Sequence, residues 1–165
     1  MSEAATIKRK NQVRASAEEA CGAIDYGPLE QRIGYALRRA QVAVFHDFFD
    51  AFSKHDLRPA QYSVLTIIEH NPGLPQGRVA EALGIQKTNF VAMIGALEAR
   101  GLVRREPSKQ DRRAHGLFLT REGEKLMVKL HKSAQMHETR IIERVGEETY
   151  RALFGPLGKI AFGGV

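Results

Sequence analysis

The sequence predicts a mainly α-helical domain that carries one small β-hairpin. Three observations lead to this prediction. Apolar residues recur at helical spacing through most of the chain from Leu29 onward. Two helical segments meet at Gly84 with the layout of a helix-turn-helix, and residues 101–123 read as two short strands around a basic turn. With 165 residues, the chain is long enough for one compact domain with appendages.

Composition narrows the possible partners. The formal charge of +6 favours a polyanionic partner, although charge alone is weak evidence. The single cysteine, Cys21, excludes an intramolecular disulfide framework. No apolar run approaches the roughly 20 residues that cross a bilayer, and no apolar segment of a signal peptide follows the basic N-terminus. We therefore expect a cytoplasmic protein without a membrane partner.

Residues 1–28 are polar and weakly periodic, and they predict a flexible basic arm. The first long helix, about 29–55, has apolar groups on opposite faces. One stripe comprises Ile33, Leu37, Ala40, Val44, Phe48 and Phe52, and the other comprises Tyr35, Arg39, Val42, His46 and Phe49. One face can meet the core of the domain, so the other needs a partner chain or a ligand cavity.

Local signals then predict each further element. Pro59 suits the first turn of a helix that continues to about His70, and Asn71-Pro72-Gly73 breaks it. Helices follow at about 76–83 and 87–100, with Gly101 as the residue after the second. Thr120 is expected to cap a long helix, whose seam comprises Met127, Leu130, Ala134, His137, Ile141 and Val145. A last helix spans about 147–162 and carries Tyr150, Leu153, Leu157 and Ile160, with a kink expected at Pro156.

The second helix of the helix-turn-helix begins with hydrogen-bonding side chains. These are Gln86, Lys87, Thr88 and Asn89. The first turn of a recognition helix reaches base edges in the major groove, where such side chains can pair with adenine, guanine or phosphate. For Gln86 and Thr88 the alternative is N-capping of the helix, which we weigh equally for Gln86.

The basic turn strengthens the prediction of DNA binding. Six basic residues against two acidic ones lie between Arg100 and Arg113, a net charge of +4. Leu117 and Leu119 alternate on one strand and are expected to fix the hairpin to the core. Its tip, with Lys109, Asp111, Arg112 and Arg113, can then enter a narrow minor groove. Asp111 is expected to hold the tip in shape rather than to face phosphate.

The run from Leu83 to Gly123, with Asp-Arg-Arg at the tip and Leu-Thr-x-x-Gly after it, resembles the multiple antibiotic resistance regulator (MarR) family of winged helix-turn-helix repressors. The resemblance implies a homodimer, a DNA-binding lobe at about 59–120, and dimerisation helices at about 29–55 and 121–162. It also implies that Arg113 enters the minor groove and that Lys87, Thr88 and Asn89 enter the major groove of a pseudo-palindromic operator. The family often carries an arginine where this chain has Ala92, so base preference does not transfer.

The first helix is also similar to a narrower group that regulates the breakdown of hydroxycinnamates and related aromatic acids. That similarity implies an aromatic effector, typically a coenzyme A thioester, and a repressor of catabolic genes. The effector residues predicted on this basis are Tyr35, Arg38, Arg39, Val42, His46, Phe49 and Tyr62. The alternative is that Tyr35, Val42 and Phe49 are core residues and that the arginines are surface groups.

Other functions are less well supported. Regulation of efflux or stress genes by a different phenolic ligand is the alternative within the family. Thiol sensing is disfavoured because Cys21, the single cysteine, precedes the first helix. The six histidines include no pair at the close spacing of metal ligands on a helix, so no metal or cofactor is expected. No catalytic motif stands out, which argues against an enzyme. The arginines of the tip argue against a module that binds protein instead of DNA.

Overall fold

The computed structural model describes residues 24–107 and 115–163. Its contacts divide the chain after Gln41 into two compact units. In the first unit, a 3-10 turn η1 (Gly27–Gln31) precedes the beginning of helix α2 (Ile33–Phe52). The predicted N-terminal arm falls largely on residues 1–23, outside the described residues, and so does Cys21.

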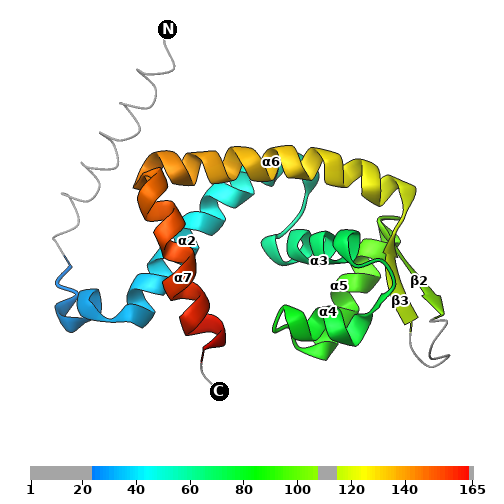
Figure 1. Cartoon of the computed structure of the whole chain (residues 1–165), viewed down its shortest axis with the longest axis horizontal. Helices are drawn as coiled ribbons and strands as arrows, with labels where there is room; N and C mark the ends of the chain where they lie inside the picture. The colour runs from blue at the N-terminus through cyan, green and yellow to red at the C-terminus, as the bar shows by residue number, and fades with distance from the viewer. Residues whose placement is uncertain (1–23, 108–114, 164–165) are drawn as a thin grey trace, which may run out of the picture. The chain divides into compact units, whose positions relative to one another are not determined.

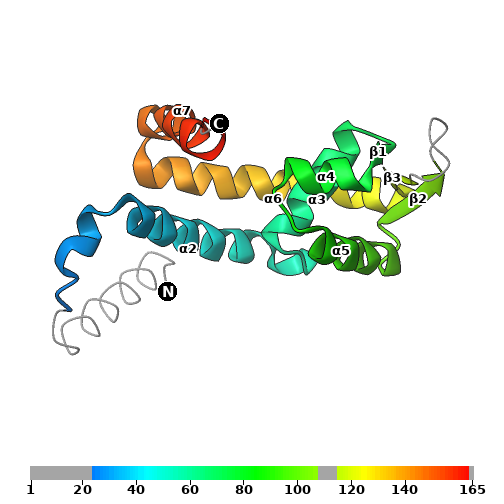
Figure 2. The ribbon, with the colours of Figure 1, turned by 90° about the horizontal axis from the view of Figure 1, so that it is seen from below.

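The second unit contains the remaining elements (Figures 1 and 2). In order after α2 they are η2 (Ser53–His55), α3 (Pro59–His70), β1 (Leu74–Pro75), α4 (Gln76–Ala82), α5 (Lys87–Ala99), β2 (Val103–Pro107), β3 (His115–Leu119), α6 (Arg121–Val145) and α7 (Glu147–Phe162). The predicted fold class, mainly α-helical with a small β-hairpin, is confirmed. Figure 1 shows the strands near the N-terminal end of α6 and α7 at its other end.

The helix boundaries follow from local chemistry. Pro59 occupies the first turn of α3, where a missing N–H costs nothing, and the side chain of Gln61 accepts a hydrogen bond from the Arg58 backbone. Helix α5 ends where Gly101 adopts a φ of 67°, and the Leu102 N–H then donates to the Leu97 carbonyl at 3.0 Å. Both ends were predicted from the sequence.

The sheet has three strands in the order β1-β3-β2, all antiparallel. Strand β1 was not predicted, because two residues after Asn71-Pro72-Gly73 carry no periodicity. It forms because β3 supplies its partner: the Gly73 N–H donates to the Leu117 carbonyl at 2.8 Å. The two backbones approach so closely that a Cβ at Gly116 would lie 2.6 Å from the Gly73 carbonyl oxygen.

The hairpin is fixed to the core as predicted, since Leu117 and Leu119 are both buried. Thr120 caps α6: its hydroxyl accepts from the Gly123 N–H at 3.0 Å and donates to the Gly101 carbonyl at 2.5 Å. The largest fully buried side chains are Phe52, Leu65, Ile68, Phe90, Ile94, Leu97, Leu117, Met127 and Leu130. The core thus joins α2, α3, α5 and α6 to the sheet.

The C-terminal helices differ in burial. Along the predicted seam of α6, Met127, Leu130 and His137 are buried, whereas Val145 is exposed. Helix α7 has no buried residue, and its apolar residues Leu153, Leu157 and Ile160 are all exposed in the single chain. Helix α7 therefore contributes an apolar surface rather than core.

Candidate functional site

Helices α4 and α5 form the predicted helix-turn-helix. Gly84 in the turn adopts a φ of 61°, a conformation that glycine takes without strain. The Ile85 N–H donates to the Ala80 carbonyl at 2.9 Å, and the Ile85 side chain packs against the core. On α5, Phe90, Ile94 and Leu97 are fully buried, so the opposite face of this helix is turned to solvent.

The first turn of α5 presents the side chains predicted to read bases. Gln86, Lys87, Thr88 and Asn89 are all exposed. Gln86 occupies the N-cap position, but no side-chain hydrogen bond caps this helix in the structure. The alternative role of Gln86 as a capping side chain is thus not observed, and its amide is available to a ligand.

The other predicted DNA contacts belong to the tip of the hairpin. These residues, Lys109, Asp111, Arg112 and Arg113, lie within residues 108–114, outside the described residues. The ladder on either side of them runs from Val103 opposite Leu119 to Pro107 opposite His115.

Three of the six basic residues counted around the hairpin have intramolecular partners. The Arg100 guanidinium donates to the carbonyls of Asp56 at 2.7 Å and His55 at 2.9 Å. Arg104 pairs with Glu106 and lies over the Phe118 ring, and Arg105 pairs with Glu98 at 2.7 Å. These contacts hold the three guanidinium groups against the fold, so a count of charges alone does not show which of the six side chains are free to turn toward a ligand.

Three predicted effector residues lie in the first unit, on the first turns of α2. The Arg39 guanidinium carbon lies 6.0 Å from the centre of the Tyr35 ring, a cation–π arrangement. The rings of Tyr26 and Tyr35 are 5.9 Å apart. Arg38 is exposed and 3.4 Å from the Gln41 side chain. Both arginine side chains are therefore exposed, and that of Arg39 lies beside an aromatic ring.

The remaining predicted effector residues lie in the second unit. Val42, His46 and Phe49 are exposed, and His46 Nδ1 is 3.6 Å from the Asp50 carboxylate. Tyr62 on α3 is half-buried, and its ring packs 5.1 Å from that of Phe52. Tyr62 thus contributes to the core, whereas the other three present side chains to solvent.

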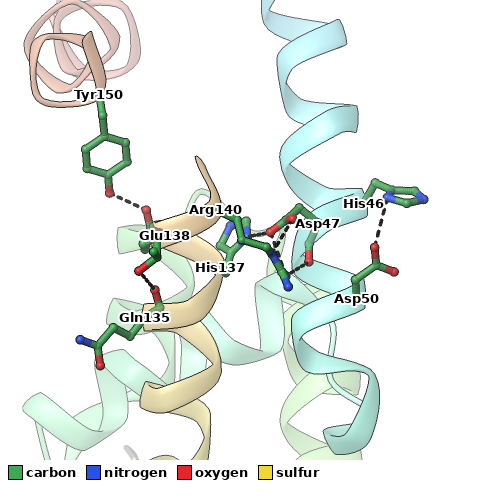
Figure 3. Close-up of polar contacts among 9 residues, drawn as sticks. His46, Asp47, Asp50, Gln135, His137, Glu138, Arg140 and Tyr150 are labelled. Carbon is green, nitrogen blue, oxygen red and sulfur yellow. Dashed lines mark hydrogen bonds and ion pairs between the residues drawn. The ribbon is translucent and has the colours of Figure 1, made fainter. Parts of the chain in front are cut away.

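A buried polar cluster between α2 and α6 was not predicted (Figure 3). Only 8% of Asp47 and 6% of His137 is exposed, and His137 Nδ1 lies 2.5 Å from Asp47 Oδ1. Arg140 donates through Nη2 to the same oxygen at 3.1 Å, and its Nε lies 2.8 Å from Asp47 Oδ2 without hydrogen-bond geometry. The cluster therefore joins the C-terminal half of α2 to the middle of α6.

Opposing effects act on the Asp47 carboxyl group. Burial acts to raise the pKa of Asp47. Hydrogen bonds from His137 and Arg140, with the positive charges of both, outweigh burial and hold this pKa below its usual value. Sequence reasoning placed His137 on the apolar seam of α6 but gave Asp47 no role. The only feature of the sequence that pointed to a buried role for Asp47 was its position directly beside the apolar stripe of α2.

Within the described part of the chain, no group of three or more His, Cys, Asp or Glu side chains is arranged to hold a metal ion. None of the helices among the described residues is long and apolar enough to span a membrane.

The fold and the helix-turn-helix define a winged-helix transcriptional regulator, and comparison with known proteins gives the family. The MarR family model matches residues 55–114. A structure of the transcriptional repressor CouR bound to a 23-mer DNA duplex is 42% identical, with a TM-score of 0.77 over 85% of this chain and 99% of that one. A structure of CouR bound to p-coumaroyl-CoA is 41% identical, with a TM-score of 0.79 over 84% of this chain and 98% of that one.

Among sequence relatives, a putative transcriptional regulatory protein for the hcr operon of Thauera aromatica is 27% identical over 136 residues, which are 82% of each chain. The chain belongs to the MarR family. Like the relatives that it matches, it is a transcriptional regulator and not an enzyme.

Proposed function

We propose that the protein is a homodimeric repressor that binds a pseudo-palindromic operator. Helix α5 enters the major groove and the hairpin tip enters the adjacent minor groove. The DNA-binding lobe comprises residues 59–120, and the helices on either side of it form the dimer. The observation that carries this proposal is the exposed first turn of α5, which offers four hydrogen-bonding side chains on a helix whose other face is fully buried.

Similarity to a DNA complex supports this assignment. CouR, which is 42% identical over nearly its whole length, is known in complex with a DNA duplex. We assign base contacts to Gln86, Lys87, Thr88 and Asn89. Lys109, Arg112 and Arg113 contact the backbone and the minor groove, with Asp111 as a support for Arg113.

Exposed apolar side chains support the dimer. On α2 these are Val42, Phe45 and Phe49, and on α7 they are Leu153, Phe154, Leu157, Ile160 and Phe162. Phe154 alone is 60% exposed. Large apolar side chains left exposed along a helix mark an interaction site, and a symmetric dimer would cover the same residues on both subunits.

We further propose that an aromatic acyl-CoA releases the repressor from DNA and thereby controls genes of aromatic-acid breakdown. CouR binds p-coumaroyl-CoA. On α2 of this chain, Arg38 and Arg39 offer guanidinium groups suited to phosphates, and Tyr35, Val42, His46 and Phe49 continue the helix with aromatic and apolar groups. Tyr62 contributes from α3. An effector that prefers the conformation with low DNA affinity releases the operator.

Two measurements test the proposal. Duplexes are selected from a random library by the full-length protein, and their affinity is measured by fluorescence anisotropy at rising salt. Binding should weaken steeply with salt, and failure to enrich any duplex would refute the assigned function. p-Coumaroyl-CoA, p-coumarate and coenzyme A are then added separately. Release by the thioester alone is expected, whereas release by the free acid would identify a small phenolic effector instead.

A further inference from the structure

The exposed face of the recognition helix is apolar beyond its first turn. Spacings of three and four residues place five side chains on one stripe of α5, which we call the α5 stripe. Its members are Thr88, Val91, Ala92, Gly95 and Ala99, all exposed. The buried residues Phe90, Ile94 and Leu97 lie on the opposite side.

Val91 is the largest side chain on this stripe, and it has no role in the core. It is 47% exposed. A β-branched residue on a solvent-facing helix position adds nothing to helix stability, since its rotamer freedom is restricted there. Its neighbours Ala92 and Gly95 are small, and a Cβ at Gly95 would meet no atom within 4 Å. Val91 therefore projects from a face that lets another molecule approach the helix backbone closely.

The α5 stripe lacks side chains that can hydrogen-bond base edges after Thr88. The residues that follow on the exposed side are Val91, Ala92, Gly95, Ala96 and Ala99, none with a polar side-chain atom. The next polar residues have partners within the chain: Glu98 pairs with Arg105 at 2.7 Å, and Arg100 donates to the carbonyls of His55 and Asp56. If α5 lies in the major groove, its second and third turns can recognise only an apolar feature there.

The major groove offers one such feature. Thymine carries a 5-methyl group at the groove edge, while the other bases present hydrogen-bond donors and acceptors. We propose that Val91, with the methyl groups of Thr88 and Ala92 beside it, contacts this methyl group and selects thymine at one position in each half-site. This inference depends on the proposed placement of α5 in the major groove. DNA is favoured over a protein partner because Lys87 and Asn89 adjoin the stripe with groups that suit phosphate and bases.

The test removes single methyl groups from the DNA. Duplexes selected by the full-length protein are resynthesised with deoxyuridine in place of each thymidine, which deletes only the 5-methyl group. Dissociation constants are measured by fluorescence anisotropy at one salt concentration. We expect one thymine in each half-site to be sensitive: removal of its methyl group should raise the dissociation constant about fourfold. This factor follows from the transfer free energy of one methyl group. Substitution in both half-sites should weaken binding about fifteenfold.

Variants link that thymine to one side chain. V91A should bind the thymidine duplex about as weakly as the wild type binds the deoxyuridine duplex, and removal of the methyl group should then have little further effect. The control is V128A, since Val128 is another exposed valine, 61% exposed, on α6. V128A should keep the full sensitivity to the methyl group. Thermal unfolding of both variants should match the wild type because neither side chain is buried.

The possible failures are distinguishable. If the protein enriches no duplex, both the proposed function and this inference are overturned. If duplexes bind but no thymine is sensitive, or if V91A keeps the full methyl sensitivity, the inference alone fails. If V91A changes the mass of the protein in solution instead, the stripe is a protein contact and the inference is also wrong.

Discussion

His137 Nδ1 lies 2.5 Å from Asp47 Oδ1, and both residues are almost completely removed from solvent. The contact joins residues 90 positions apart in the sequence and connects α2 to α6. Because the Asp47 carboxylate is buried, water cannot replace its hydrogen bonds to His137 and Arg140 if they are lost. The geometry predicts a measurable dependence of stability on pH.

Asp47→Asn should lower the free energy of unfolding by about 2 kcal/mol near neutral pH, because a charge-assisted hydrogen bond is lost in a buried site. The pKa of Asp47 is lower in the folded protein than in the unfolded chain. Its contribution is therefore complete above the unfolded pKa, about 4, and is lost as the pH falls through the folded pKa. Urea titrations at several pH values should show a flatter acid profile for the variant.

Asp50→Asn is the matched control, because Asp50 and its partner His46 are both exposed. Exposed ion pairs contribute little, so this variant should keep the stability and pH profile of the wild type. Equal loss in both variants would show that the buried cluster has no special role.

Thr120→Ala should destabilise the protein by about 1 kcal/mol, since α6 loses its N-terminal cap. The same hydroxyl also donates to the Gly101 carbonyl, so the variant loosens the end of α5 as well. Thermal unfolding measures the loss. Thr120→Ser retains the hydroxyl and should recover most of the stability; no recovery would mean that the methyl group matters more than the cap.

Tyr150 should ionise at a higher pH than a tyrosine side chain in an unfolded chain. Its hydrogen bond to the Glu138 carboxylate, with burial and the negative charge of Glu138, raises the pKa of Tyr150 to about 12. Because the folded pKa exceeds the unfolded value of about 10, this contribution to stability is lost as the pH rises from about 10 to about 12. Ultraviolet titration of tyrosinate should show a late step that is absent in Tyr150→Phe and shifted to lower pH in Glu138→Gln.

Arg113→Ala should weaken operator binding and reduce the slope of affinity against salt by about one unit, if this side chain reaches the DNA as proposed. Anisotropy titrations at several salt concentrations measure both effects. Arg151→Ala removes the same charge from an exposed i,i+4 pair with Glu147 on α7 and serves as the control. Identical behaviour of the two variants would remove Arg113 from the interface.

Arg39→Ala should blunt release by p-coumaroyl-CoA while leaving DNA affinity unchanged, because the guanidinium is proposed to meet a phosphate of the effector. Arg32→Ala is the control in the same unit, since Arg32 follows the η1 turn and precedes α2. Release is followed by anisotropy of a labelled duplex. Normal release from the Arg39 variant would place the effector elsewhere.

Sequence reasoning predicted the elements that are determined locally. Pro59, Gly84 and Gly101 act through their own backbone, and Thr120 caps α6 through the nearby Gly123, so these roles are visible without the fold. The features that could not be predicted from the sequence depend on contacts between segments that are far apart in the chain. Strand β1 exists only because β3 lies beside it, and Asp47 becomes a buried acid only when α6 brings His137 and Arg140 to it.

The same distinction applies to the candidate site. The exposed first turn of α5 could be predicted, because burial of Phe90, Ile94 and Leu97 follows from helical periodicity. The partners of Arg100, Arg104 and Arg105 could not be predicted, because a count of charges does not show which side chains already have partners within the chain. Periodicity also located the apolar residues of α7, which are exposed in the single chain, but periodicity does not tell a core from a surface that a second chain covers.

The two hydrogen bonds from Arg100 have a mechanical consequence. They tie the last turn of the recognition helix to the chain corner at His55 and Asp56, which directly follows α2. A displacement of that corner must either carry the end of α5 with it or break both bonds. Arg100 therefore couples the end of α2 to the end of the recognition helix, and the two segments move together for as long as both bonds hold.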